Sequence, residues 1–272
     1  MRGYLAADGF EAELAHELGE VDERFGRLML AAGPPREVGF GLGQPREVAW
    51  AQNIWLEPRR MPIASIKDAA RQLRDIQRNW VCHSWCEHRR ASLIQEQLPH
   101  VSAKAIEPFS ELPRAPLGSW TLLDRDTLLA SPSCSSPFPH GEVRFVEDRE
   151  GPPSRAYRKL WELFMLAGAW PGAGQRVLDL GSAPGGWTWV LAELGAHVIS
   201  VDKADLDPRL AARPNVEVRR QSAFALDPSD VGPVDWLFSD LICYPSRLLA
   251  LVRKWRAAGV KRCVCTIKFQ GE

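Results

Sequence analysis

The most informative stretch of the chain is Val177-Leu-Asp-Leu-Gly-Ser-Ala-Pro-Gly-Gly-Trp-Thr188. Apolar residues lead into Asp179, and glycines follow at positions 181, 185 and 186 with Pro184 between them. This pattern is typical of a buried parallel strand that turns sharply into a helix over a small molecule, because glycine tolerates positive φ and lets a ligand approach the backbone. It lacks the Gly-x-Gly-x-x-Gly spacing of dinucleotide folds and the Gly-Lys-Ser/Thr that holds a triphosphate. An ordinary tight strand-to-helix turn is the alternative interpretation.

The composition sets the class of protein. With 272 residues, 45% of them hydrophobic and 25% charged, the chain has room for two soluble domains, each with its own core. No apolar run approaches the ~20 residues of a membrane span, and residues 1–11 lack the pattern of a secretion signal. We therefore expect a cytoplasmic protein with no membrane partner. Basic and acidic residues each number 34, so a nucleic-acid partner would need locally concentrated positive charge.

Such a concentration occurs in residues 59–90, where two tryptophans, Trp80 and Trp85, lie among the basic residues. The basic residues are Arg59, Arg60, Lys67, Arg71, Arg74, Arg78, Arg89 and Arg90. One interpretation is an RNA-binding surface, on which arginines meet phosphates and aromatic rings meet unstacked bases. The other is a solvated helix face with the tryptophans turned into the core. The sequence leaves both open.

The six cysteines are unevenly spread, which favours a reducing compartment over a disulfide framework. Cys263 and Cys265 alternate in an apolar run, so we expect them on one face of a buried strand, where cysteine acts as a small hydrophobe. Residues 82–88 contain two cysteines and two histidines, but no second ligand pair follows at zinc-finger spacing. We expect no metal.

Two regions with different patterns follow each other along the chain, and we place them at 1–145 and 146–272. The first is predicted to be α+β, with a helix capped by Asp8 and another opened by a capping box at Ser65-Ile-Lys-Asp68. Its other predicted elements are strands over Arg27–Ala31 and Glu47–Trp55, a helix over Ala91–Leu98 and a hairpin of Trp120–Leu123 with Thr127–Ala130.

The second region alternates strands with helices, which predicts an α/β fold with a mostly parallel sheet. The predicted strands are Arg176–Asp179, His197–Asp202, Val216–Arg219, Val234–Asp240 and Lys261–Phe269, with helices at Thr188–Leu194 and Ser246–Ala258 among them. Ligands of such sheets bind outside the carboxyl ends of the strands. The glycine turn, Asp202 and Asp240 all fall at such ends.

Three further residues have side chains suited to proton transfer. Lys159 lies on a predicted helix before the first strand, with Ser154 as its cap; Asp240 ends the fourth strand and Lys268 closes the fifth. A lysine in so apolar a strand is costly unless it is exposed, paired or functional. A lysine can act as a base when desolvation or a second cation makes its proton easier to lose.

These motifs resemble the FtsJ-type ribose 2′-O-methyltransferases, which use S-adenosylmethionine (SAM) and a Lys-Asp-Lys-Glu tetrad. The resemblance rests on the Pro184-Gly-Gly-Trp187 form of the glycine turn and on the order and context of the three residues above. It implies a Rossmann-like methyltransferase domain in which Lys268 is the general base, Lys159 is the nearby cation and Asp240 orients Lys268.

The resemblance also implies a SAM site. Its residues would be Asp179, Gly181, Ser182, Pro184, Gly185, Gly186, Trp187, Asp202 and Ser222. Asp202 is placed to accept hydrogen bonds from the ribose or adenosine, although a helix cap is its alternative role. Many relatives have an acid after the third strand that meets adenine. Here that stretch is Gln221-Ser-Ala-Phe224, so adenine binding would rest on Ser222, the backbone or Phe224.

Within that family the chain looks most like the RlmM-type bacterial methyltransferases, strongly so after residue 130. The shared stretches include Ser136-Pro-Phe-Pro-His-Gly141, Trp255-Arg-Ala-Ala-Gly259 and Thr266-Ile-Lys268, whereas residues 269–272 look more like the wider family. The resemblance implies an amino-terminal ferredoxin-like and THUMP-type RNA-binding region. It also implies a cytidine ribose of 23S rRNA, or of a ribosomal precursor, as the substrate. We expect a monomer.

The chain stops at Glu272, before the last strands of a methyltransferase sheet and the tetrad's glutamate. We expect a fragment, since the fifth strand would otherwise be an open apolar edge. The alternative function is a non-catalytic RNA-binding or assembly factor that keeps the methyltransferase fold. A nicotinamide-dependent oxidoreductase is disfavoured by the glycine spacing.

Overall fold

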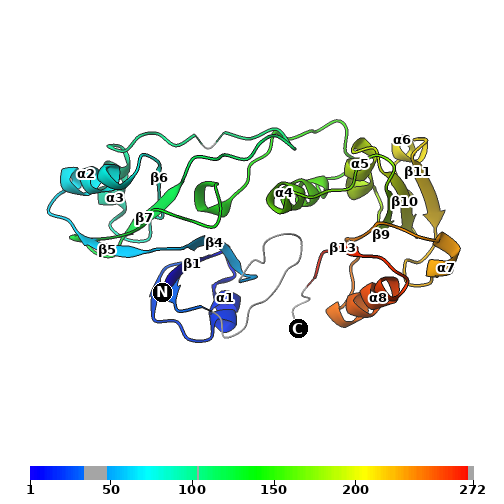
Figure 1. The fold of residues 1–272 in the computed structure, drawn as a ribbon, viewed down its shortest axis with the longest axis horizontal. Coiled ribbons are helices and arrows are strands. Elements are labelled where there is room, and N and C mark those ends of the chain that lie inside the picture. The colour runs from blue at the N-terminus through cyan, green and yellow to red at the C-terminus, as the bar shows by residue number, and fades with distance from the viewer. Residues whose placement is uncertain (34–47, 103, 269–272) are drawn as a thin grey trace. The chain divides into compact units, whose positions relative to one another are not determined.

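The computed structural model describes residues 1–33, 48–102 and 104–268 (Figure 1). The chain divides into two compact units, Met1–Val146 and Glu147–Glu272. Among the described residues, no helix is long and apolar enough to cross a membrane.

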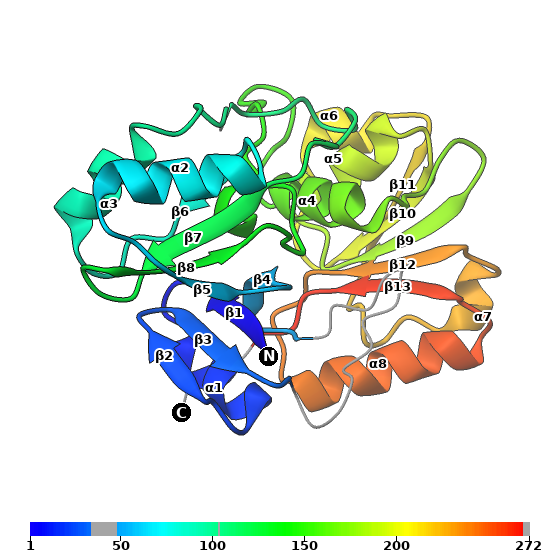
Figure 2. The same ribbon diagram turned by 60° about the vertical axis from the view of Figure 1, so that its left-hand side comes forward.

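The first unit begins with a four-stranded antiparallel sheet in the order β2-β3-β1-β4. Its strands are β1 (Arg2–Ala6), β2 (Glu23–Phe25), β3 (Leu28–Ala31) and β4 (Ala51–Trp55). Helix α1 (Glu11–Leu18) connects β1 to β2 and covers one face, where its Leu14 and Leu18 pack with Tyr4 and Met29 (Figure 2). The predicted strand over Glu47–Trp55 forms only from Ala51 onward.

A second four-stranded sheet in this unit has the order β5-β8-β7-β6. Its strands are β5 (Arg59–Pro62), β6 (Trp80–Cys82), β7 (Gly118–Leu122) and β8 (Thr127–Ser131). β7 and β8 form the predicted antiparallel hairpin, and β6 lies parallel to β7. Helices α2 (Ile66–Ile76) and α3 (His88–Gln95) cover one face with Leu73 and Ile94 (Figure 2). Leu5 of β1 and Leu129 of β8 share a core cluster, so the two sheets pack together.

Local capping signals were right at one helix of this unit and wrong at another. The Ser65 hydroxyl accepts a hydrogen bond from the Asp68 N–H at 3.0 Å, which confirms the capping box of α2. The prediction that Asp8 caps α1 is wrong. The residue before α1 is Phe10, no side chain caps there, and a turn closed by the Phe10 N–H and the Ala7 carbonyl separates Asp8 from the helix.

Of the two tryptophans in the basic segment, Trp80 is turned into the core, as the second interpretation of that segment expected, whereas Trp85 is half-buried. Trp80 is 0% exposed and its indole N–H donates to the Leu73 carbonyl at 2.8 Å. Trp85 donates to the Leu122 carbonyl at 2.7 Å. Neither indole N–H is therefore available to a ligand.

The second unit contains a five-stranded parallel sheet in the order β11-β10-β9-β12-β13, which confirms the predicted α/β class. Its strands are β9 (Arg176–Leu180), β10 (His197–Asp202), β11 (Val216–Arg220), β12 (Trp236–Ser239) and β13 (Arg262–Cys265). The chain runs outward from β9 to β11 and then returns to β12 on the other side of β9. The carboxyl ends of β9 and β12 thus form the topological switch point, where such sheets bind ligands.

Helices cover both faces of this sheet (Figure 2). Their bounds are α4 (Tyr157–Ala167), α5 (Gly186–Glu193), α6 (Pro208–Ala211), α7 (Pro228–Val231) and α8 (Pro245–Ala257), and a short 3-10 helix, Pro139–Gly141, lies in the first unit. On one face, Phe164 of α4 and Trp187 of α5 meet Phe238 edge-on. On the other, Leu251 and Trp255 of α8 complete a core with the sheet.

Two expectations about this unit need correction. Ser154 does not cap α4, because the residue before the helix is Ala156 and bonds from the Arg158 and Lys159 N–H groups to carbonyls three residues back close its first turn. The fifth strand ends at Cys265, so Lys268 lies in the segment after β13 and not within it. The expectation about residues 269–272 lies outside the described residues.

Candidate active site

The turn between β9 and α5 needs glycine at two positions. Gly181 has φ 78°, and a Cβ there would lie 2.7 Å from the Leu241 side chain. Gly185 has φ 118°, and its Cβ would lie 2.8 Å from Leu206. Because any side chain would collide as well as strain the backbone, this turn keeps its shape only with glycine.

Asp202, at the end of β10, fastens this turn to the neighbouring strand. Its Oδ2 accepts a hydrogen bond from the Ala183 N–H at 3.0 Å, and its Oδ1 accepts one from the Ala204 N–H at 3.0 Å. The next residue of the turn, Pro184, accepts through its carbonyl from the Asp207 N–H at 3.0 Å. Each carboxylate oxygen has a further lone pair, so Asp202 can hold the turn and still accept a ligand hydroxyl.

Two of the expected cofactor residues pack against the start of α4. Trp187 is 4% exposed, and its indole N–H donates to the Ala156 carbonyl at 3.0 Å. A Cβ on Gly186 would lie 3.3 Å from the Ala156 side chain. Trp187 and Gly186 therefore hold the start of α4, the helix that carries Lys159. The Trp187 indole and the Gly186 Cα face this helix.

A chain of buried hydroxyls begins at Asp179 in β9. The Thr188 hydroxyl of α5 donates to Asp179 Oδ2 at 2.7 Å and lies 3.3 Å from the Ser200 hydroxyl, which donates to Ser182 at 2.7 Å. Asp179 is 1% exposed, and its Oδ1 has no hydrogen-bond partner among the described residues. Burial raises the pKa of Asp179 to about 7, although the bond from Thr188 works against the rise.

The structure brings Lys159, Asp240 and Lys268 together from three elements. Lys159 Nζ of α4 lies 3.0 Å from Asp240 Oδ2, just after β12. Lys268 Nζ lies 3.1 Å from Asp240 Oδ1 and donates to the Asp240 carbonyl at 2.9 Å. One carboxylate thus bridges two amino groups that are far apart in the sequence.

Asp240 stays ionised in this position. Its side chain is 17% exposed, and although burial works to raise the pKa of this carboxyl, hydrogen bonds from Lys159, Lys268 and Thr266 outweigh it and lower the pKa. The Thr266 N–H also donates to the Ser239 carbonyl at 2.9 Å, which aligns the segment leading to Lys268 with the end of β12.

The remaining expected residue, Ser222, follows the carboxyl end of β11, where its carbonyl accepts from the Ala225 N–H at 3.0 Å. The glycine turn, Asp202, Ser222 and Asp240 thus follow the carboxyl ends of β9, β10, β11 and β12. Sequence reasoning missed Thr188, Ser200 and Thr266. The available signal was a hydroxyl residue within an apolar segment, and it is visible at Ser200 in His-Val-Ile-Ser-Val-Asp.

Comparison with known proteins identifies the region that carries most of these residues, although Lys268 lies beyond the end of the family-model match. Residues 152–255 match the family model described as FtsJ-like methyltransferase. Among curated proteins, ribosomal RNA large subunit methyltransferase M of Methylococcus capsulatus is 39% identical over 48% of this chain and 38% of its own length. The proteins of that name from Thauera aminoaromatica and Marinobacter nauticus are 38% and 35% identical, over 50% and 54% of this chain.

The matches span about two fifths of each relative, 38%, 38% and 42% of their lengths. They confirm the resemblance that the glycine turn and the three charged residues indicated. Residues 152–255 are therefore similar to the FtsJ-like methyltransferases.

Proposed function

We propose that this protein is a SAM-dependent RNA ribose 2′-O-methyltransferase that acts on large-subunit rRNA, with a cytidine 2′-hydroxyl as the acceptor. The observation that carries the proposal is Asp240 bridging Lys159 and Lys268 at 3.0 and 3.1 Å, at the switch point of a parallel sheet. The names of the curated relatives support rRNA as the substrate.

The residues at the carboxyl edge of the sheet fit SAM. The turn at 181–186 leaves backbone without side chains at two positions of positive φ, and the buried Asp179 Oδ1 lacks a partner among the described residues. We assign the cofactor to Asp179, Gly181, Ser182, Pro184, Gly185, Asp202 and Ser222, with Gly186 and Trp187 supporting the turn from behind. When bound, SAM supplies the methyl group that the ribose oxygen accepts.

Lys268 is suited to take the proton from that hydroxyl. A neutral amine has two N–H donors and one lone pair. Asp240 Oδ1 and the Asp240 carbonyl, at 3.1 and 2.9 Å, can accept from both donors. The lone pair is then left to accept the hydroxyl proton, and Asp240 fixes its direction.

Lys159 and Asp240 act on Lys268 in opposite senses. The positive charge of Lys159 favours loss of a proton from Lys268, whereas the carboxylate between them favours keeping it. Since Asp240 also bonds Lys159, at 3.0 Å, part of its charge is already compensated. Asp240, itself held by Lys159, thus fixes the position of Lys268.

The proposal includes RNA binding by the first unit, as a THUMP-like region. The order β2-β3-β1-β4, with α1 between β1 and β2, is compatible with the ferredoxin-like part of that expectation. Several basic residues of the 59–90 segment form ion pairs with acidic residues, for example Arg71 with Asp68 at 2.7 Å and Arg59 with Glu57 at 3.0 Å. The charge of that segment alone is therefore weak support.

The test is methyl transfer from labelled SAM to 23S rRNA that lacks ribose methylation. The wild-type protein should label the RNA, and Lys268→Ala should reduce labelling about a hundredfold or more while calorimetry finds SAM affinity within about twofold. SAM and RNA binding without any transfer would instead support the non-catalytic factor. Unchanged transfer by Lys268→Ala would mean that another group is the base.

A further inference from the structure

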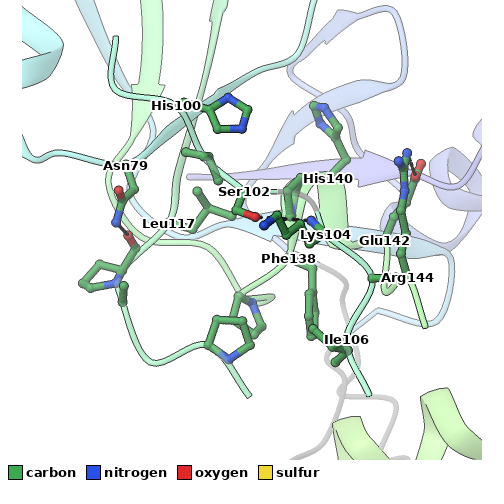
Figure 3. A pocket seen from close by; sticks show the side chains of 17 residues that line it. Asn79, His100, Ser102, Lys104, Ile106, Leu117, Phe138, His140, Glu142 and Arg144 are labelled. Atoms are coloured by element: carbon green, nitrogen blue, oxygen red, sulfur yellow. Dashed lines mark hydrogen bonds and ion pairs between the residues drawn. The ribbon is translucent and has the colours of Figure 1, made fainter. Parts of the chain in front are cut away.

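A cavity in the first unit lies apart from the residues discussed so far. Its volume is about 390 Å³, within the range of ligand pockets. Apolar walls come from Ile106, Leu117, Phe138 and prolines of the segments 113–116 and 137–139 (Figure 3). His100, Lys104, His140 and Arg144 provide its polar groups, with Glu142 beside Arg144.

Backbone pairing holds this cavity open. The Ile106 N–H donates to the Arg144 carbonyl at 2.8 Å and the Ile106 carbonyl accepts from the Val146 N–H at 3.0 Å, so two distant segments are fixed side by side. On the opposite wall, the Asn79 amide donates to the Pro116 carbonyl at 3.3 Å. Proline limits the conformational freedom of the remaining backbone. Binding of a ligand therefore costs little conformational entropy here.

The charge of the cavity favours an anion. Lys104 is exposed and has no carboxylate partner in the described part of the chain. Arg144 lies 3.8 Å from Glu142, at the limit of an ion pair, and the two side chains are 66% and 46% exposed. Burial lowers the pKa of His140, so at neutral pH this ring offers an uncharged aromatic face.

A second cavity of about 490 Å³ adjoins the first. The two share His100, Val101 and Pro139 in their linings, so His100 stands between them. A single-stranded nucleic acid has a flat base and an anionic phosphate in each nucleotide. It binds at successive sites of this kind, with an aromatic ring between neighbouring bases and a cation near the phosphate backbone.

We propose that the cavity at 100–144 binds one unstacked nucleotide of single-stranded RNA, with the base between the proline and Phe138 walls and the His100 ring, and the phosphate at Lys104 and Arg144. That RNA is the partner rests on the proposed function. The new element is the place where the first unit binds this RNA. Unstacked bases packed on aromatic rings, with phosphates on basic side chains, are the usual form of single-strand recognition.

The first experiment measures binding of a fluorescein-labelled oligouridine to the full chain by anisotropy at several salt concentrations. His100→Ala should weaken binding about fivefold or more through lost stacking. Lys104→Ala should weaken it and reduce the slope of log affinity against log salt by about 0.7, the value of one phosphate contact on a single strand. Lys104→Arg should restore the slope.

Matched controls come from exposed residues outside the cavity: His16→Ala on α1 and Lys261→Ala before β13 should bind like wild type. Equal affinity of His100→Ala, Lys104→Ala and these controls would overturn the proposal, as would a wild-type chain that does not bind the RNA.

The second experiment locates the contact with an oligonucleotide that contains 4-thiouridine. Cross-links should map to residues 100–117 or 137–144, and cross-links confined to other segments would overturn the proposal. The proposed function is tested independently by methyl transfer with Lys268→Ala. Loss of transfer there, with unaltered RNA binding by His100→Ala, would reject the nucleotide pocket and leave the methyltransferase standing.

Discussion

The neighbouring strands β9 and β12 each present an aspartate near the carboxyl edge of the sheet, and the two carboxylates differ in every contact. Asp179 is 1% exposed, receives one hydroxyl and has its pKa raised to about 7. Asp240 is 17% exposed, bonds two lysines and Thr266, and has its pKa lowered. Asp179 pairs in register with Phe238, two residues before Asp240, so a short step along the sheet separates an acid near its midpoint of ionisation at neutral pH from a fixed anion.

The difference shows how one sheet edge can support two tasks. A buried acid near its midpoint of ionisation can donate or accept a hydrogen bond beside the glycine turn without a full charge. An anion held between two amino groups can orient a base but cannot readily take a proton itself. The proposed function therefore places cofactor binding at the end of β9 and proton transfer at the end of β12.

The largest effect is expected from Asp240→Asn. The amide keeps the shape of the side chain but leaves Lys159 and Lys268 next to each other without the negative charge between them, so Lys268 loses its orientation. Methyl transfer should fall about a hundredfold to a thousandfold, with SAM affinity nearly unchanged by calorimetry. The matched variant Asp230→Asn, on the exposed part of α7, should keep wild-type transfer. Equal activity of the two variants would remove Asp240 from the site.

Asp179→Asn should instead change how stability depends on pH. The folded pKa of Asp179, about 7, is above the unfolded value, so the folded state holds the proton while the unfolded chain has lost it. Stability therefore falls as pH rises between about 4 and about 7, by up to about 1.4 kcal/mol per pH unit from this group. In Asp179→Asn the unfolding free energy, measured by urea unfolding at several pH values across this range, should lose that part of its dependence on pH.

Asp240 provides the internal control for that measurement. Because its folded pKa is lowered, its stabilising contribution is complete above the unfolded value and is lost only as pH falls below about 4. Asp240→Asn should thus change the slope between about pH 4 and 7 much less than Asp179→Asn does, because burial is the largest cause of the raised pKa of Asp179 and the Asp240 charge is a smaller one. An unchanged slope in Asp179→Asn would contradict the assignment of a raised pKa to the end of β9.

The parts of the structure that were predictable from sequence are those that local patterns specify. Alternating strands and helices predict the parallel sheet, and the spacing of Ser65 and Asp68 predicts the start of α2. Lys159 and Asp240 are 81 positions apart in the chain, and no spacing rule connects them. Their proximity was expected only because their contexts resemble a family.

The parts that were not predictable depend on tertiary contacts. Trp187 belongs to the recognised turn, yet its indole is used to hold Ala156, because α5 packs against the start of α4. Asp8 and Ser154 have the right chemistry to cap helices, but turns in the chain begin each helix two or more residues later. The bond from Thr188 to Asp179 exists only once α5 lies on β9.

A smaller effect on catalysis is expected from Lys159→Gln. The amide can still bond Asp240 but has no charge, so Lys268 keeps its proton more readily. Transfer at neutral pH should fall about tenfold, and more of the activity should return at higher pH. Recovery of the rate at higher pH distinguishes this effect from misplacement, which would lower the rate at every pH. A uniform loss would mean that Lys159 only positions Asp240.

The smallest effect is expected from Thr188→Val, which removes the hydroxyl from Asp179 Oδ2 at nearly constant volume. Asp179 would then lose the hydroxyl bond but keep the one from the Thr188 backbone N–H, and a buried acceptor that loses a partner costs about 1–3 kcal/mol. We expect unfolding free energy to fall by about 1 kcal/mol, because the raised pKa lets Asp179 take a proton in compensation. Methyl transfer at saturating SAM should fall much less than in Asp240→Asn. If it fell as far, the ends of β9 and β12 would act as one catalytic unit, and the division of tasks between them would be wrong.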